Sequence, residues 1–335
     1  MTTTRIGLAG YGFGGRYFHA PLLASADGVE FAGVVTRSPE RRAQVEREHP
    51  GTTTFDNLSA LAEAGAEAVV ISTPATTHIP LALEAIELGL AVVVDKPFAL
   101  DAAQARTAVE AAEAAGVVLS VYQNRRWDSD LLTVRRLLEQ GELGEVTRFE
   151  SAFERFATEP VPAAGGGILR DFGSHLIDQA LLLFGPVASV YGEGDLEERF
   201  SAVLQHQGGM TSHIAGDWRQ GAPAPRFRVR GSAGSYIVFG MDGQEEALIA
   251  GRSPATEGDA WGTEPPERWG RLQRGESAEP VPSERGRWDT YYPAFAAAVR
   301  GERPVPVDPR DAVASLTVID AIRESTQQGQ VLTTT

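Results

Sequence analysis

Three titratable side chains in this chain have types and a spacing that suit proton transfer. Lys96 follows the apolar run Val92–Val94 and precedes Pro97, so a cation stands at the end of a predicted strand. Asp171 and His175 are four residues apart and share one face if this segment is a helix. Histidine can accept a proton from a hydroxyl group near neutral pH, and lysine can stabilise negative charge that develops on oxygen. We therefore predict that Lys96, Asp171 and His175 are catalytic and also contact the substrate.

A structural interpretation of the same segment is the alternative. We expect the helix to run from about Gly173 to Phe184, so Asp171 could cap its start and His175 could be a hydrogen-bonded core residue. Asp178 shares the face at i+7 from Asp171. In the catalytic interpretation, Asp171 either holds the histidine in one tautomer or binds a substrate hydroxyl. The choice depends on whether the rest of the chain supplies a redox cofactor.

A glycine-rich turn follows the first predicted strand and precedes a helix. The run Gly10-Tyr11-Gly12-Phe13-Gly14-Gly15 fits the pattern G-x-G-x-x-G. Its glycines allow a tight turn and a close approach of backbone N–H groups to a pyrophosphate at a helix N-terminus. A turn that binds no ligand is the alternative, but the position directly after the first strand favours a dinucleotide. We predict cofactor contacts from Gly10, Gly12, Phe13, Gly14 and Gly15.

The end of the second predicted strand bears on the type of dinucleotide. NAD sites place a carboxylate there, whereas NADP sites offer cations and hydroxyls to the 2′-phosphate. This chain has Thr36, Arg37 and Ser38 at that position and no acidic residue. The alternative is that Arg37, with Arg41 and Arg42, forms only a solvated helix start. We predict NADP as the cofactor, with NAD second.

The order of predicted elements indicates an α/β fold with two domains. Apolar strands are expected at Arg5–Gly10, Val29–Val35, Ala68–Ser72, Ala91–Val94 and Val117–Tyr122, and helices such as His78–Leu88 and Ala102–Ala115 lie between them. This alternation predicts a doubly wound parallel (Rossmann) sheet over residues 1–123. Because the strands end at one edge, Gly10, Thr36, Thr73, Lys96 and Gln123 should lie along it. His78 opens a helix and is interpreted as structural or cap-like rather than as a base.

Residues 124–335 have a different pattern. After a helix at Ser129–Gln140, short alternating strands joined by glycine turns predict an α+β domain with a large open, mostly antiparallel sheet. These strands are expected at Val187–Glu193, Phe200–His206, Met210–Asp217, Phe227–Gly231 and Ser235–Gly240. Residues 251–290 are interpreted as a surface loop, with a lid or an interface segment as the alternative. Asp308–Gln327 predicts a closing helix that packs back on the first domain.

The composition restricts the class of protein. With 335 residues, 42% hydrophobic and 22% charged, the chain suits two soluble domains. A net charge of −15 without a Lys/Arg-rich run argues against binding to nucleic acid or to an anionic membrane. No apolar run approaches the roughly 18 residues of a membrane span and no signal core is visible, so we expect a cytoplasmic protein. The absence of cysteine excludes disulfides and thiolate zinc sites, and the histidine spacing predicts no metal site.

The chain resembles the glucose–fructose oxidoreductase/inositol dehydrogenase (Gfo/Idh/MocA) family over nearly its whole length. The resemblance is carried by the Gly10–Gly15 loop, Ser72-Thr73-Pro74 with His78, Asp95-Lys96-Pro97, and Asp171 with His175. It implies that Lys96, Asp171 and His175 form the catalytic set. Asp95 stands where this family has a glutamate and is one methylene shorter.

A finer resemblance is to the NADP-dependent scyllo-inositol dehydrogenase-like branch. It rests on Gly10-Tyr11-Gly12 with Phe18-His19-Ala20-Pro21, on Asn124-Arg125-Arg126-Trp127-Asp128 and on Gly165-Gly166-Gly167-Ile168. The resemblance implies a polyol or sugar substrate with Arg155, at the end of an expected strand, near the substrate mouth. It also implies a homodimer or homotetramer that assembles through the second-domain sheet. The further cofactor contacts that we expect on this basis are Thr73, Pro74, His78, Lys96, Pro97, Asn124 and Trp127.

These observations predict an oxidoreductase that transfers a hydride between a secondary alcohol of a cyclic polyol or sugar (scyllo-inositol-like) and NADP. An aldose 1-dehydrogenase or a dihydrodiol dehydrogenase on the same scaffold is an alternative within the enzymes. A non-catalytic NADP-binding regulator is an alternative of another class. The presence of Lys96, Asp171 and His175 together favours an enzyme over the regulator.

Overall fold

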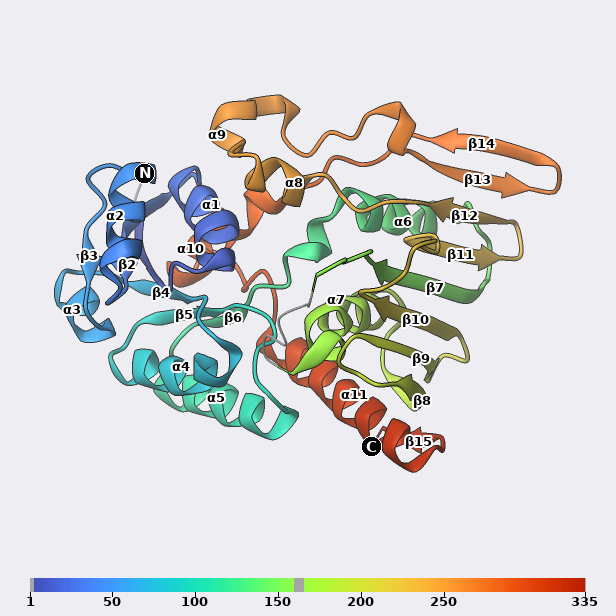
Figure 1. Ribbon diagram of the computed structural model, residues 1–335, viewed down its shortest axis with the longest axis horizontal. Coiled ribbons are helices and arrows are strands. Elements are labelled where there is room, and N and C mark those ends of the chain that lie inside the picture. The colour runs from blue at the N-terminus through green and yellow to red at the C-terminus, as the bar shows by residue number, and fades with distance from the viewer. Residues whose placement is uncertain (1–2, 160–165, 335) are drawn as a thin grey trace.

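The central strands of the first sheet, Ala68–Ile71 and Ala91–Val94, are apolar along their whole length and buried. In the computed structural model, which describes residues 3–159 and 166–334, the strands form a parallel sheet in the order β3-β2-β1-β4-β5-β6. This is the predicted doubly wound arrangement, with helices on both faces of the sheet (Figure 1). The strands are β1 (Thr4–Ala9), β2 (Val29–Val35), β3 (Thr54–Phe55), β4 (Ala68–Ile71), β5 (Ala91–Val94) and β6 (Leu119–Val121).

The helices around this sheet begin and end at residues that the sequence marks clearly. The side chain of Asp101 accepts a hydrogen bond from Gln104 N at 2.8 Å and caps α5, which ends at Gly116 in the left-handed region. Both ends of α5 were predicted to the residue. The helices are η1 (Gly15–His19), α1 (Ala20–Ala24), α2 (Pro39–Glu48), α3 (Leu58–Glu63), η2 (Ala75–Thr77), α4 (His78–Glu87) and α5 (Ala102–Ala115).

The second sheet is larger and mostly antiparallel, as predicted. Its order is β14-β13-β12-β11-β7-β10-β9-β8-β15, and only the central pair β7 and β10 runs parallel among the described residues. A strand that ends at Arg155 was expected, and β7 is that strand; it joins the two halves of the sheet. The strands are β7 (Val146–Glu154), β8 (Val187–Gly194), β9 (Arg199–His206), β10 (Thr211–Asp217), β11 (Phe227–Gly231), β12 (Gly234–Val238), β13 (Gly270–Arg274), β14 (Ser277–Val281) and β15 (Leu332–Thr333).

Residues 251–290 are not the simple surface loop that their composition indicates. They contain β13 and β14, which extend the sheet, and their Trp261 and Trp288 are buried. The bias toward Pro, Gly and charge reflects short elements joined by tight turns. The other elements of this part are η3 (Asn124–Trp127), α6 (Ser129–Glu139), α7 (Gly167–Phe184), α8 (Gln244–Ile249), α9 (Pro254–Glu257), η4 (Gly258–Ala260), η5 (Pro266–Arg268), η6 (Trp288–Thr290), α10 (Tyr291–Val299) and α11 (Pro309–Gln328).

Two long helices connect the sheets. α7 and α11 lie side by side against one face of the larger sheet, and α11 also packs on α5 of the first sheet (Figure 1). Asp320 of α11 accepts a hydrogen bond from the backbone N–H of Ala102 at 3.0 Å. The C-terminal helix therefore packs back on the first part of the chain, as its position in the sequence predicted.

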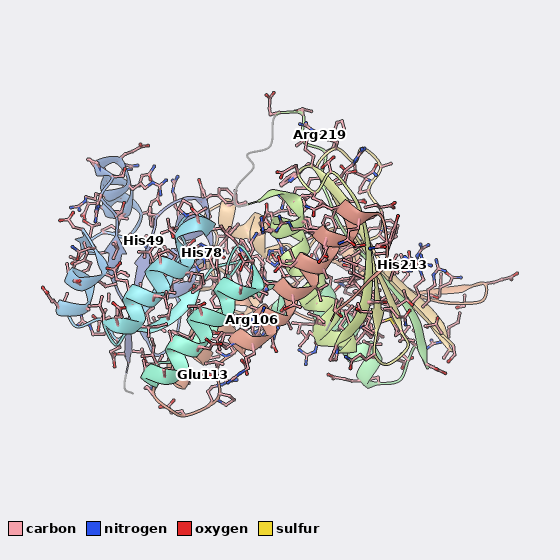
Figure 2. The ribbon with its side chains drawn as sticks, turned by 90° about the horizontal axis from the view of Figure 1, so that it is seen from below. His49, His78, Arg106, Glu113, His213 and Arg219 are labelled. Atoms are coloured by element: carbon pink, nitrogen blue, oxygen red, sulfur yellow. The ribbon has the colours of Figure 1, made fainter. Side chains whose placement is uncertain are left out.

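In the described part of the chain, no helix packs on the other face of the larger sheet (Figure 1). In Figure 2, His213 of β10 lies on this face, on the side away from α11. Among residues 3–159 and 166–334, no helix is long and apolar enough to cross a membrane. The same residues contain no group of three or more His, Asp or Glu side chains placed to hold a metal ion.

Candidate active site

The glycine loop turns sharply between β1 and η1. Gly10 has a φ of +97°, and a Cβ at this position would lie 2.3 Å from the carbonyl oxygen of Ser72. A Cβ on Gly12 would lie 3.4 Å from Nη1 of Arg41, so a cation stands beside the loop. A tight glycine turn at the start of a helix, with a cation next to it, fits the phosphates of a dinucleotide.

The end of β2 has the residues that were predicted to favour NADP. Ser38 caps α2 by accepting a hydrogen bond from Arg41 N at 3.3 Å, and exposed Arg37 donates Nε to the carbonyl oxygen of Asp56 at 3.1 Å. Arg42 instead pairs with the carboxylate of Asp56 at 2.6 Å. Arg42 is thus engaged by Asp56, whereas the Nη atoms of Arg41 lie beside Gly12 of the loop.

A cavity of about 450 Å³ lies beside the carboxyl edge of the first sheet and is called the cleft below. Its volume is in the range of small-molecule sites. It brings together side chains from the first sheet, from β7 and from α7, which are far apart in the sequence. The predicted site residues that line it are Phe13, Gly14, Thr73, Pro74, His78, Lys96, Pro97, Asn124, Arg155, Asp171 and His175.

Lys96 and Asp171 form an ion pair across this cleft. Nζ of Lys96 donates to Oδ1 of Asp171, and the Lys96–Pro97 peptide bond is cis. α7 begins at Gly167, six residues earlier than predicted, so Asp171 lies inside the helix and does not cap it. Asp171 is bonded to the lysine and not to His175, so its expected role in holding the histidine tautomer is wrong.

His175 is buried in the cleft wall as a neutral side chain. Burial, followed by the positive charges of Lys96 and Arg125, holds its pKa well below the usual 6.5. Neither ring nitrogen hydrogen-bonds to a described residue, and Nδ1 is fully buried. The interpretation of His175 as a hydrogen-bonded core residue is therefore wrong. An unprotonated imidazole with no partner can accept a proton from a bound hydroxyl group.

Asp95 anchors the backbone of the lysine. Its Oδ1 accepts from Lys96 N at 2.8 Å, and its Oδ2 accepts from Ser72 Oγ at 2.9 Å and from His19 Nε2 at 3.0 Å. Burial opposes ionisation of this carboxyl, but His19 and Lys96 outweigh it and bring the pKa of Asp95 down to about 2. The shorter side chain thus has a full set of partners in this chain.

His78 joins two of the strand ends. One ring nitrogen lies 2.8 Å from the carbonyl oxygen of Thr73 and the other lies 2.8 Å from that of Pro97. These bonds tie the turn after β4 to the peptide that follows Lys96. The structural interpretation of His78 is confirmed by these contacts, although its ring also lines the cleft.

Two residues named from the sequence lie outside the group that lines the cleft. Trp127 packs edge-on against Tyr291 with the ring centroids 5.7 Å apart, and its contact with the cofactor stays a prediction. Asp178 does not join Asp171 and His175, because it is buried in an ion pair with Arg126. Gly165, which supports the branch resemblance, is outside the described residues.

Several cleft residues were not predicted as site residues. Arg125 belongs to the quoted 124–128 motif, which was a usable signal, whereas Glu245 lies in a short helix without any motif. An aromatic surface contributed by separate elements completes the cleft. Its members are Phe18, Tyr122, Phe153, Phe172, Trp218 and Trp288. Only the folded chain brings these residues together, so no spacing in the sequence identifies them as a set.

Comparison with known proteins identifies the family. The Gfo/Idh/MocA profile described as an oxidoreductase family with an NAD-binding Rossmann fold matches residues 4–123, and the profile of its C-terminal α/β domain matches residues 135–334. The chain is 33% identical to the scyllo-inositol 2-dehydrogenase (NADP(+)) IolW of Bacillus subtilis, over 99% of this chain and 96% of that protein. It is 40% identical to the uncharacterised oxidoreductase YdgJ of Escherichia coli, over 90% and 91% of the two chains. The crystal structure of the oxidoreductase yvaA from Bacillus subtilis superposes with a TM-score of 0.91 at 32% identity, covering 99% and 98% of the two chains. The chain therefore belongs to the Gfo/Idh/MocA oxidoreductases and is an NAD(P)-dependent dehydrogenase that acts on CH–OH groups.

Proposed function

We propose that this dehydrogenase uses NADP and oxidises a secondary alcohol of a cyclic polyol or sugar, with scyllo-inositol as the first candidate. The single observation that carries the proposal is the cleft in which the Lys96–Asp171 ion pair and neutral His175 stand together. The name of the relative IolW supports both the substrate class and the cofactor.

The cofactor fits the first sheet through its strand ends. The Gly10–Gly15 loop would hold the pyrophosphate, and Thr36, Arg37 and Ser38 would meet the ribose that carries the 2′-phosphate. The wall formed by Thr73, Pro74, His78, Pro97 and Asn124 would hold the nicotinamide end. When bound, the nicotinamide exchanges a hydride with the carbinol carbon.

The side chains of the cleft accept the hydroxyl proton and stabilise the negative charge that develops on the substrate oxygen. His175 takes the hydroxyl proton, a task typically worth about 10²–10⁴-fold in rate. Lys96 donates to the substrate oxygen while negative charge develops on it, which is worth about 10²–10³-fold for one such donor. Asp171 orients the ammonium of Lys96 through their ion pair.

A turnover panel tests this proposal. Scyllo-inositol, myo-inositol, glucose, xylose and a dihydrodiol are each assayed with NADP and with NAD, and NADPH binding is followed by fluorescence. We expect turnover of a cyclic polyol or sugar and a preference for NADP. Tight binding of NADPH without turnover of any compound would instead indicate a regulator, and a clear preference for NAD would contradict the assignment of Arg37 and Ser38.

We also propose that residues 1–123 and 124–335 are the two domains and that a second copy of the chain docks on the helix-free face of the larger sheet. That face is hollowed between β7, β9 and β10, where Tyr191, Val203 and Ala215 stand among charged side chains. Light scattering after size-exclusion chromatography measures the mass. A monomer at micromolar concentration would contradict the docking.

A further inference from the structure

Glu245 lies between two arginines in the cleft. Its Oε1 accepts a hydrogen bond from Nη2 of Arg155 at 2.7 Å, and its Oε2 is paired with Nη2 of Arg125. Its side chain is 14% exposed. Burial opposes ionisation, but Arg125 and Arg155 outweigh it and lower the pKa of Glu245 to about 2. The carboxylate is therefore an acceptor at neutral pH, with lone pairs left over for a ligand.

Buried polar residues fix the start of the helix that carries Glu245. Asp242 accepts hydrogen bonds from Ser129 N at 2.7 Å and from Gln244 N at 2.8 Å. Oε1 of Gln244 accepts from Trp288 N at 2.9 Å. These bonds tie α8 to α6 and η6, so Glu245 is held in position before any ligand arrives.

Arg155 is held over the aromatic surface of the cleft. Its Cζ lies 5.2 Å from the ring centroid of Phe153, 5.8 Å from that of Phe172 and 5.7 Å from that of Trp218. The side chain is 41% exposed, and among the described residues its Nε and Nη1 donate no hydrogen bond. A fixed guanidinium with free donors thus stands beside an ionised acceptor.

We propose that Glu245 and Arg155 together bind two adjacent hydroxyl groups of the substrate, other than the hydroxyl that is oxidised, and that Arg125 positions Glu245 for this contact. This inference rests on the proposed function and adds the part of the substrate that is recognised. One hydroxyl donates to Glu245, and the oxygen of its neighbour accepts from Arg155. The aromatic rings beside them suit the C–H face of a hydroxylated ring.

The pair selects for a neutral substrate. A carboxylate on the substrate would be attracted by Arg155 but repelled by ionised Glu245, which holds the same guanidinium at 2.7 Å. A vicinal diol has both a donor and an acceptor and satisfies both side chains. The site therefore fits neutral cyclic polyols and sugars better than sugar acids.

The test uses a substrate whose hydroxyls are not equivalent, myo-inositol or glucose, and compares it with its deoxy analogues, each of which lacks one hydroxyl. In the wild type we expect at least one deoxy analogue to lose about 10- to 100-fold in kcat/KM, the usual effect of a hydrogen bond to a charged group. In Glu245→Gln the kcat/KM for the parent substrate should fall by a similar factor, and the discrimination between the parent and that analogue should shrink to within about threefold.

Two further variants keep the result interpretable. Arg155→Met leaves Glu245 paired with Arg125 and should lose the discrimination against the analogue that lacks the neighbouring hydroxyl, even if Glu245→Gln folds poorly because Arg125 is left without its partner. Glu246→Gln is the matched control, because Glu246 is the next residue of α8, is 70% exposed and pairs with Arg268 outside the cleft. It should keep the wild-type kcat/KM within about threefold.

The outcomes separate this inference from the proposed function. Undiminished discrimination by both Glu245→Gln and Arg155→Met would overturn the diol site while leaving polyol oxidation intact. A preference of the wild type for glucuronate over glucose would also overturn it. If the wild type oxidises no polyol or sugar with either cofactor, the proposed function fails and the diol site fails with it.

Discussion

The ion pair of Arg126 with Asp178 is predicted to hold the catalytic helix in place. Nε and Nη2 of Arg126 donate to the two carboxylate oxygens of Asp178 at 2.8 and 2.6 Å, and Nη1 donates to Asp311 at 2.9 Å. Arg126 is in η3, Asp178 is in α7 with Asp171 and His175, and Asp311 is in α11. One guanidinium therefore connects three elements around the cleft.

The size of the expected stability loss follows from the burial of Asp178. The side chain of Asp178 is 2% exposed, so Arg126→Met leaves a buried carboxylate without its cation. Breaking a buried pair in this way costs about 3–5 kcal/mol of folding free energy. Burial already raises the pKa of Asp178 despite Arg126, so in the variant the carboxyl should protonate more readily. The loss of stability should therefore be largest at high pH and should shrink as the pH falls toward about 5.

Urea unfolding followed by tryptophan fluorescence measures the effect. Arg126→Met combined with Asp178→Leu removes both buried charges and should recover most of the lost stability, because Asp311 is half-exposed and remains solvated. Arg310→Met is the matched control, since Arg310 joins α11 to Glu113 of α5 through an exposed pair and should cost at most about 1 kcal/mol. Figure 2 shows Glu113 on α5 at the surface. If Arg126→Met is as stable as the control, or if the double variant is no better than the single one, this reasoning is wrong.

Two other predictions concern the base and the loop. His175 acts in its neutral form, and burial together with Lys96 and Arg125 holds its pKa well below 6.5. The kcat/KM for alcohol oxidation should therefore stay level as the pH falls to about 6. A decline of kcat/KM centred at or above pH 6.5 would contradict this role. Gly10→Ala should abolish NADPH binding in a fluorescence titration, because the added Cβ would lie 2.3 Å from the carbonyl oxygen of Ser72. Gly51→Ala is the control: Gly51 also has a positive φ, +82°, but open space surrounds it, so this variant should bind NADPH normally. Equal affinities of the two alanine variants would show that the loop does not need this close approach.

The local patterns of the sequence predicted most of the fold. Strand β5 ends at the residue that the apolar run Val92–Val94 indicates, and α5 has the cap and the glycine that were read from the sequence. For β7 only the end at Arg155 was expected, because its polar positions, such as Arg148 and Glu150, interrupt the apolar alternation. On the open face Glu150 pairs with Arg228 and Arg230 of the neighbouring β11, and such cross-strand partners are not visible in the sequence of one strand.

The candidate site was predictable where a motif marks it. Lys96, Asp171 and His175 all line one cleft, but their bonding differs from the expectation, because α7 starts at Gly167 and turns Asp171 toward Lys96. Glu245 could not be predicted, since it reaches the cleft only through tertiary bonds of its neighbours Asp242 and Gln244. Local spacing identifies residues of one element, whereas contacts between distant elements appear only in the folded chain.

We propose that Lys96 and His175 carry out the proton and charge chemistry of hydride transfer from a polyol. The most direct measurement is the single-turnover rate of NADPH formation with scyllo-inositol in the wild type, in Lys96→Met and in His175→Asn. We predict a fall of about 10²–10³-fold for the lysine variant and about 10²–10⁴-fold for the histidine variant, with NADPH binding retained in both. A wild-type rate in either variant, with saturating cofactor and substrate, would contradict the claim.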